Sequence, residues 1–253
     1  MTVRKYLVAL LVTGAWLVLG GVASAAFPNY SDCPSSTPNF EGCLDIQGVS
    51  GNLRIKEFTV PLNDSLEIRG AVANEGVGRS TFVPPTGTTG LFAKPVSVPG
   101  GLLGIEWIPG TSVLALTELA GPPSGIRLDL GNFRVGIPVK VRLVNLLLGM
   151  DCHIGTDSRP VMLNLATERT NPPPPNTPIT GSIGSGPRFV PPAELQVLGA
   201  VNVENSFAVP GATECGLGLG LINALVNLKL GLPSAAGNNS IEIKNNIGIR
   251  LTP

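Results

Sequence analysis

The segment from Ile137 to Thr167 constrains the fold most strongly, because its apolar and polar residues alternate. One face of an extended chain would carry Val139, Val141, Leu143 and Asn145, and the other would carry Lys140, Arg142 and Val144. A period of two is typical of a strand with one buried face. The alternation resumes at Val161, after turn-forming residues around Cys152. We therefore predict a hairpin that carries one cysteine at its tip.

The rest of the chain repeats this pattern of short apolar runs between turns. Of its residues 43% are hydrophobic and 13% are charged, and 32 glycines and 24 prolines separate the runs. Such a pattern indicates an all-β protein with many turns. Further strands are expected at residues 53–60 and 66–72, joined as a hairpin by 61–64, and at 113–119, 126–130, 195–209 and 240–251. We predict a single β domain over residues 51–253, an antiparallel sandwich, with a small β-barrel as the alternative.

Residues 1–25 have the form of a signal peptide. Arg4 and Lys5 give a basic start, an apolar run follows, and small residues at 23–25 fit a cleavage site. A retained membrane anchor is the alternative, but the apolar run is short and contains glycines. We expect an exported chain with no membrane span after removal of the signal. Residues 26–50 are expected to form an ordered loop that a disulfide closes.

The four cysteines of an exported chain indicate two disulfides, with three pairings open to them. Their spacing favours Cys33 with Cys43, which leaves Cys152 with Cys215. A zinc site is the weaker interpretation, because no two cysteines lie two to four residues apart.

A single amphipathic helix is expected at residues 218–229, ended by Gly231 and Pro233. Its apolar residues recur at helical spacing, at Leu217, Leu221, Ala224, Leu225 and Leu228. We predict that this face packs on the sheet. A membrane-active helix is the alternative, but the polar face has one lysine and no aromatic anchor.

A proline-rich connection spans residues 171–178 and begins with the sequence NPPPPN. Prolines stiffen such a segment into the extended polyproline form. It could link two domains or serve a proline-binding partner, but we favour a connection inside one domain, because few residues follow it.

Charge and motifs exclude several function classes. Without its signal peptide the chain has two more acidic than basic residues and no basic run, which argues against nucleic acid as a partner. His153 is the only histidine, so a base for a catalytic triad is hardly available. Four acidic residues in or near strands have no distinctive spacing: Glu67, Glu106, Glu118 and Asp129. Asp151 and Asp157 could bind calcium, but turn formation explains them better. We predict no catalytic residue, no cofactor and no metal ligand.

Three aromatic residues are candidates for a binding surface, namely Phe82, Phe92 and Trp107. They fall in a loop-rich region, and loops often carry binding surfaces. Aromatic residues make up only 5% of the chain, so the core competes for them.

Residues 145–181, 205–216 and 231–239 resemble a recurring set of exported, Gly/Pro-rich actinobacterial proteins whose function is not assigned. The likeness extends from about Phe58 to Asn245. Cys152 and Cys215 both lie inside the recurring strings, which is compatible with their pairing. The resemblance implies no catalytic residue, and it places His153 where the set would have an aromatic residue.

We therefore expect a secreted or cell-envelope protein of structural or binding type, without enzymatic activity, that acts on an unknown envelope or extracellular partner. A carrier of an apolar small molecule such as a lipid is the second hypothesis, because an aliphatic interior would permit a cavity. A secreted hydrolase is the third.

Overall fold

The computed structural model describes residues 27–251 except for 77–78, 102–103, 105–109, 130–131 and 217–219. The predicted signal peptide at residues 1–25 and the candidate Trp107 lie outside this part of the chain. The elements found in it are β1 (Phe40–Ile55), β2 (Phe58–Pro61), β3 (Leu66–Gly76), β4 (Arg79–Val83), β5 (Leu91–Ala93), β6 (Val96–Ser97), β7 (Leu114–Leu119), β8 (Ser124–Asp129), β9 (Asn132–Val144), β10 (His153–Ile154), β11 (Val161–Ala166), β12 (Arg188–Val190), β13 (Glu194–Glu204), β14 (Ala212–Thr213), α1 (Gly220–Leu230) and β15 (Asn239–Leu251).

One layer of the fold is built around β1. Strand β15 pairs antiparallel with nearly the full length of β1, and β13 continues the layer beyond β15. On its other edge β1 pairs first with β3 and then with β2. Strands β4 and β5 pair with β3, and β12 pairs with β13. Every one of these pairs is antiparallel.

The second layer is built around β9. Strands β11 and β10 pair along one edge of β9, while β8 and β7 pair along the other. The pairing of β9 with β11 confirms the predicted hairpin, with Val139 opposite Val161. The predicted faces are also confirmed, because Val139 and Leu143 are buried whereas Val144 is exposed. Cys152 lies in the connection between the two strands, directly before β10.

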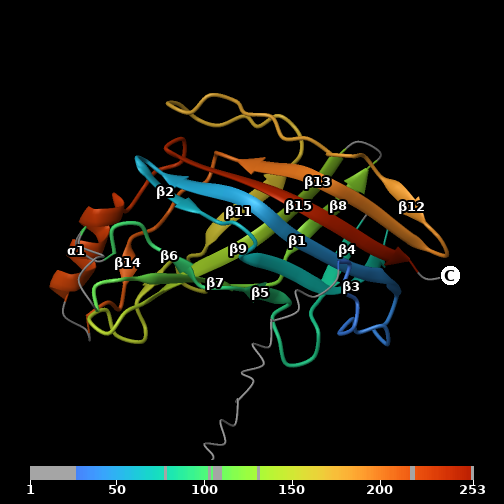
Figure 1. Cartoon of the computed structure of the whole chain (residues 1–253), viewed down its shortest axis with the longest axis horizontal. Coiled ribbons are helices and arrows are strands. Elements are labelled where there is room, and N and C mark those ends of the chain that lie inside the picture. Colours follow the sequence, from blue (N-terminus) through green and yellow to red (C-terminus); the bar gives the residue numbers. More distant parts are fainter. Residues whose placement is uncertain are drawn as a thin grey trace, which may run out of the picture.

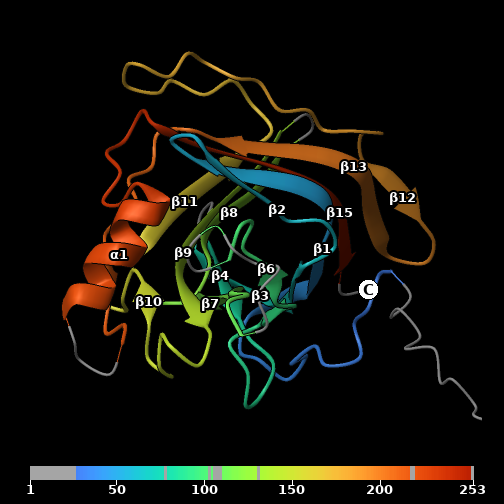
Figure 2. The same cartoon turned by 60° about the vertical axis from the view of Figure 1, so that its left-hand side comes forward.

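The two layers face one another as a sandwich. A single residue pair between β11 and β13, Ala166 with Val203, joins them into one sheet that folds over on itself. At the other side β4 lies against β8 and β5 against β7. Figure 2 shows β13, β1 and β2 on one side of the interior and β9 and β7 on the other. The fold class is therefore the predicted antiparallel β-sandwich with one helix.

The N-terminal part differs from the prediction. Residues 40–50 were expected in a loop but form the first part of β1, which pairs with β3 and β15 on its two edges. The expected hairpin of residues 53–60 with 66–72 is also wrong. The chain turns at Lys56 and Glu57, so that β2 folds back on the end of β1, whereas β3 pairs with its beginning. Polar residues such as Asp45 made these positions look like a loop in the sequence, but Asp45 is buried in the strand.

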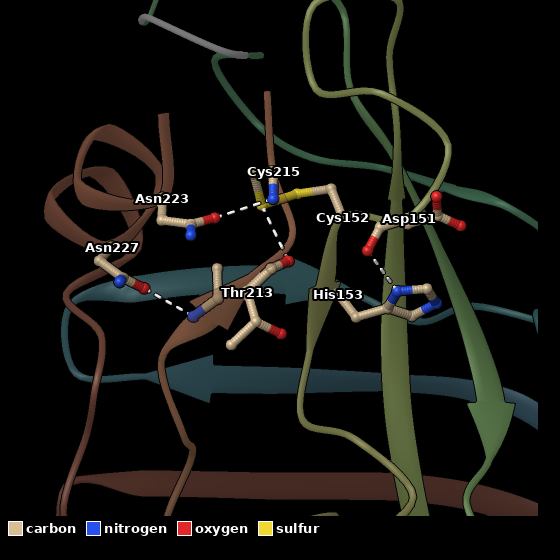
Figure 3. The surroundings of a disulfide bond; sticks show 8 residues. Asp151, Cys152, His153, Thr213, Cys215, Asn223 and Asn227 are labelled. Atoms are coloured by element: carbon tan, nitrogen blue, oxygen red, sulfur yellow. Dashed lines mark hydrogen bonds between the residues drawn. A yellow bond between two sulfur atoms is a disulfide. The ribbon is translucent and has the colours of Figure 1, made fainter. Parts of the chain in front are cut away.

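The predicted helix is present, but the apolar face that was expected to pack on the sheet is exposed to solvent. Val226 and Leu230 are buried, whereas Leu221 and Leu228 are 72% and 81% exposed. Two polar side chains of the helix, Asn223 and Asn227, point inward instead, because they bond backbone groups of the preceding segment. Oδ1 of Asn223 accepts a hydrogen bond from the backbone N–H of Cys215 at 2.8 Å, and Oδ1 of Asn227 accepts one from Ala212 at 2.7 Å (Figure 3).

Both predicted disulfides are present, Cys33 with Cys43 and Cys152 with Cys215. The second bond ties the connection after β9 to the segment before α1, as Figure 3 shows. Two such bonds are typical of a protein that folds in an oxidising compartment. Within the described residues, none of the helical structure is long and apolar enough to cross a membrane.

Candidate binding sites

His153 lies beside the Cys152–Cys215 disulfide and points away from it (Figure 3). Its Nδ1 lies 2.7 Å from the carbonyl oxygen of Asp151. A carbonyl oxygen only accepts, so Nδ1 carries the proton and donates. Its Nε2 faces Oε2 of Glu118 at 3.7 Å. The ring is therefore held at Nδ1 by a backbone carbonyl group, and Nε2 faces a carboxylate rather than a hydroxyl or thiol nucleophile.

Glu118 is the centre of a charge network on the outer face of β7 and β9. Nε of Arg142 lies 2.7 Å from Oε1 of Glu118, and Nζ of Lys140 lies 4.0 Å from Oε2. Asp157, considered above as a calcium ligand, instead lies 2.8 Å from Lys140. Such a mixed-charge network stabilises the sheet surface modestly.

Two of the three aromatic candidates, Phe82 and Phe92, lie in the described part of the chain, and neither is exposed. Phe82 is only 4% exposed, so its prediction as a surface residue is wrong. Its ring packs over Gly70 and Gly90, where a Cβ atom would lie 2.6 Å from the ring. The ring of Phe92 is half-buried and carries the guanidinium of Arg69 at 4.0 Å. Trp107, as stated, lies outside the described residues.

A polar groove lies where the proline-rich segment passes over the sheet. We call residues 169–180 the arm; an antiparallel bridge between Arg169 and Thr180 closes its base. In Figures 1 and 2 it projects from the outer side of the layer that contains β13 and β15. The groove has a volume of about 450 Å³ and is lined by Asn52, Arg54, Thr59, Asn176, Thr177, Ile179, Asn205, Ser240, Ile241 and Glu242.

Hydrogen bonds from asparagine side chains hold the arm in place. Nδ2 of Asn176 donates to the carbonyl oxygens of Asn205 at 2.9 Å and Asn239 at 2.7 Å. Nδ2 of Asn205 donates in return to the carbonyl oxygen of Thr177 at 2.9 Å. The wall of the groove is thus held by hydrogen bonds within the chain, which lowers the entropy cost of binding.

One side chain that lines this groove has an unmet hydrogen-bonding capacity. Asn205 is 2% exposed, and its Oδ1 is buried without a partner among the described residues. Buried polar atoms are nearly always hydrogen-bonded, so an exception requires an explanation. An amide oxygen accepts only, so the missing partner is a donor such as a hydroxyl group.

The charged groups at the groove balance one another. Arg54 contributes a guanidinium, whose Nη2 lies 3.4 Å from Oδ1 of Asn176, and Glu242 contributes a carboxylate. Neither side chain forms an ion pair in the described part of the chain. On β1 and β15 their neighbours pair across the strands, Arg54 with Ser240 and Asn52 with Glu242. The parts of β1 and β15 that line the groove therefore offer both hydrogen-bond donors and acceptors, and their charges sum to zero.

The interior of the sandwich holds two apolar cavities. One, of about 60 Å³, lies among side chains of both layers and is lined by two asparagines, Asn202 and Asn245. The other, of about 80 Å³, extends toward the helix, where Leu230 lines it. Thr117, Val139 and Leu163 line both. Ligand pockets usually measure 300–1,000 Å³, so neither cavity accommodates a lipid in this conformation.

A buried acid lies beneath the N-terminal segment. Asp45 is 1% exposed, and its Oδ2 accepts a hydrogen bond from the backbone N–H of Asn29 at 2.7 Å. Its Oδ1 and the hydroxyl of Tyr30 are both buried without partners within the described chain. Burial raises the pKa of Asp45 to about 6, against the lowering effect of the Asn29 hydrogen bond. Burial likewise raises the pKa of Tyr30 above its ordinary range.

No group of three or more histidine, cysteine or acidic side chains among the described residues is arranged to hold a metal ion. Comparisons of the chain with models of protein families, with curated proteins and with solved structures gave no significant match. The groove was missed in the sequence because its residues come from four distant segments. The repeated asparagines at 176, 205 and 239 were the available signal.

Proposed function

We propose that the chain is a secreted or envelope-associated, non-enzymatic binding protein that holds a neutral, hydroxyl-rich ligand such as a glycan in the groove beneath the arm. The observation that carries the proposal is the unpartnered, buried Oδ1 of Asn205, which requires a donor. A sugar hydroxyl supplies that donor. The signal-like residues 1–25 and the two disulfides support an extracellular site of action.

The charges of the groove favour a neutral ligand over an ionic one. A nucleic acid or another polyanion requires several cationic groups, whereas the groove has one guanidinium, that of Arg54, and one carboxylate, that of Glu242. The carboxylate can accept from two adjacent hydroxyls and the guanidinium can donate to others. Neutral hydrogen-bonding groups in the same groove come from Asn52, Thr59 and Ser240.

The hydrolase hypothesis receives less support. His153 and Glu118 form a surface network with Arg142 and Lys140, and neither lines the groove or the interior cavities. A hydrolytic site needs its acid and base beside the bound substrate.

Isothermal titration calorimetry with neutral tetrasaccharides, namely cellotetraose, maltotetraose and the N-acetylglucosamine tetramer, tests the proposal. We expect at least one to bind, and the exposed-residue variants Arg54→Ala and Glu242→Gln to weaken that binding at least tenfold. Arg188→Ala, at an exposed site on β12, is the matched control and should leave the affinity unchanged. Absence of binding to all three sugars, or equal binding by both groove variants, contradicts the proposal.

A further inference from the structure

We propose that the interior of the sandwich is a second binding site, for a small, neutral, apolar molecule that carries one hydrogen-bond acceptor. This site is distinct from the groove and lies on the other face of the β13–β15 layer. It does not depend on the proposed sugar binding.

The chemical class follows from Asn202. This side chain is fully buried, at 0% exposed, and it lines the cavity of about 60 Å³. Its Oδ1 accepts a hydrogen bond from Nδ2 of Asn245 at 3.0 Å, and Nδ2 of Asn245 also donates to the carbonyl oxygen of Ile243. Nδ2 of Asn202 has no partner among the described residues. A buried amide N–H without an acceptor is costly, and a ligand carbonyl would supply the acceptor.

The rest of the lining selects an apolar, uncharged molecule. Apart from the two asparagines and Thr117, the described side chains around both cavities are hydrocarbon, and none is charged. An ionic ligand would therefore lose its hydration without a counter-charge. A water molecule at Nδ2 would find few further polar partners, although bound water usually makes about three hydrogen bonds.

The size of the molecule follows from the two volumes. Val139 and Leu163 line both cavities, so the spaces of about 60 and 80 Å³ adjoin one another. An apolar cavity of about 150 Å³ in another protein binds benzene. The expected ligand is thus a ring or short chain of that size, far smaller than a lipid.

Cyclopentanone and cyclopentane form a matched pair of probes, because only the ketone has an acceptor. Titrations followed by methyl NMR should show saturable shifts at Val139 and Leu163 with cyclopentanone, and at least tenfold weaker binding of cyclopentane. Asn202→Leu should reduce this preference to less than twofold. Leu163→Phe, which fills the space, should abolish binding of both probes.

Val139→Ile fills part of the same space with less strain and replaces Leu163→Phe if that variant does not fold. It should weaken binding of both probes in parallel. Equal affinities of wild type for the two probes would overturn the proposal, as would shifts confined to surface methyl groups or an interior that holds water only.

Discussion

Asn202 and Asn205 are three positions apart in the chain, yet Asn202 lines the interior cavity and Asn205 lines the groove. Both are buried, and each has one amide atom without a partner among the described residues. At Asn202 that atom is the Nδ2 donor, which faces an apolar interior. At Asn205 it is the Oδ1 acceptor, beside a polar groove. Asn202 lies on β13, whereas Asn205 follows the end of that strand.

The difference shows that an unpartnered atom specifies the chemistry of what is missing. A donor among hydrocarbon side chains calls for an apolar molecule with an acceptor, whereas an acceptor among polar side chains calls for a hydroxyl. The supporting structure differs as well. Asn205 holds the arm through Thr177, but Asn202 bonds only its neighbour Asn245. The following variants separate the two sites, from the largest expected effect to the smallest.

Removal of the second disulfide by Cys152→Ala with Cys215→Ala should lower the free energy of unfolding by about 4 kcal/mol, because the bond closes a long loop. The helix should loosen, and Leu230 closes one end of the interior. Urea denaturation measures the loss, and ketone binding should weaken while sugar binding persists. The control, Cys33→Ala with Cys43→Ala, should cost about 3 kcal/mol and spare both sites. Loss of sugar binding with ketone binding intact would contradict the separation.

Asp45 is another buried side chain with an unpartnered atom, but unlike Asn202 and Asn205 it can ionise. Its pKa is raised to about 6 in the folded chain, so the folded state holds the proton more tightly than the unfolded state. Stability should therefore fall as the pH rises from about 4 to above 6, by about 3 kcal/mol in total. Asp45→Asn should remove this decline and be more stable than wild type at pH 7.5, as thermal unfolding across pH would show.

Asp64→Asn is the control for this titration. The hydrogen bond with Lys94 lowers the pKa of Asp64, so its contribution to stability has the opposite pH dependence. A decline that survives in Asp45→Asn would assign the effect to another group.

Asn205→Leu should lower the free energy of unfolding by about 1–2 kcal/mol, because it leaves the carbonyl oxygen of Thr177 without its hydrogen-bond donor and places a hydrocarbon side chain beside a polar groove. Amide hydrogen exchange should rise in the arm, where the backbone N–H of Asn176 bonds Gly237. Unchanged exchange there would mean that Asn205 does not hold the arm.

Asn202→Leu should change the free energy of unfolding by less than about 1 kcal/mol. It removes an unpartnered donor from an apolar site, and Asn245 keeps its bond to Ile243. The same substitution thus has a smaller effect at 202 than at 205, and chemical denaturation of both variants checks the order. A reversed order would show that the Asn202–Asn245 pair, rather than the Asn205–Thr177 bond, stabilises the layer.

The sandwich, the β9–β11 hairpin, the helix position and both disulfides could be predicted because they depend on local signals. Alternation at Val139 and Leu143 marks a half-buried strand regardless of its partners. The helix face could not be predicted in this way. Asn223 and Asn227 look like polar interruptions, yet their amides accept backbone hydrogen bonds from residues 212–215. Only tertiary contacts show that polar residues face inward there.

The groove and the interior cavities could not be predicted from the sequence for a related reason. Asn176, Asn205 and Asn239 carry no motif, and their contacts appear only when the arm folds back over β1 and β15. Phe82 was misjudged because its loop-rich surroundings concealed Gly70 and Gly90, which make space for its ring. The first part of β1 was not predicted for a similar reason, since an acidic residue such as Asp45 is seldom buried in a strand.

The arm has a consequence for the durability of the protein. Projecting loops are the usual points of proteolytic attack. Proteases that bind a substrate as an added strand require its backbone N–H groups, and residues 172–175 are prolines that have none. This projecting segment is thus poorly suited to cleavage, so the wall of the groove should resist digestive proteases longer than other loops.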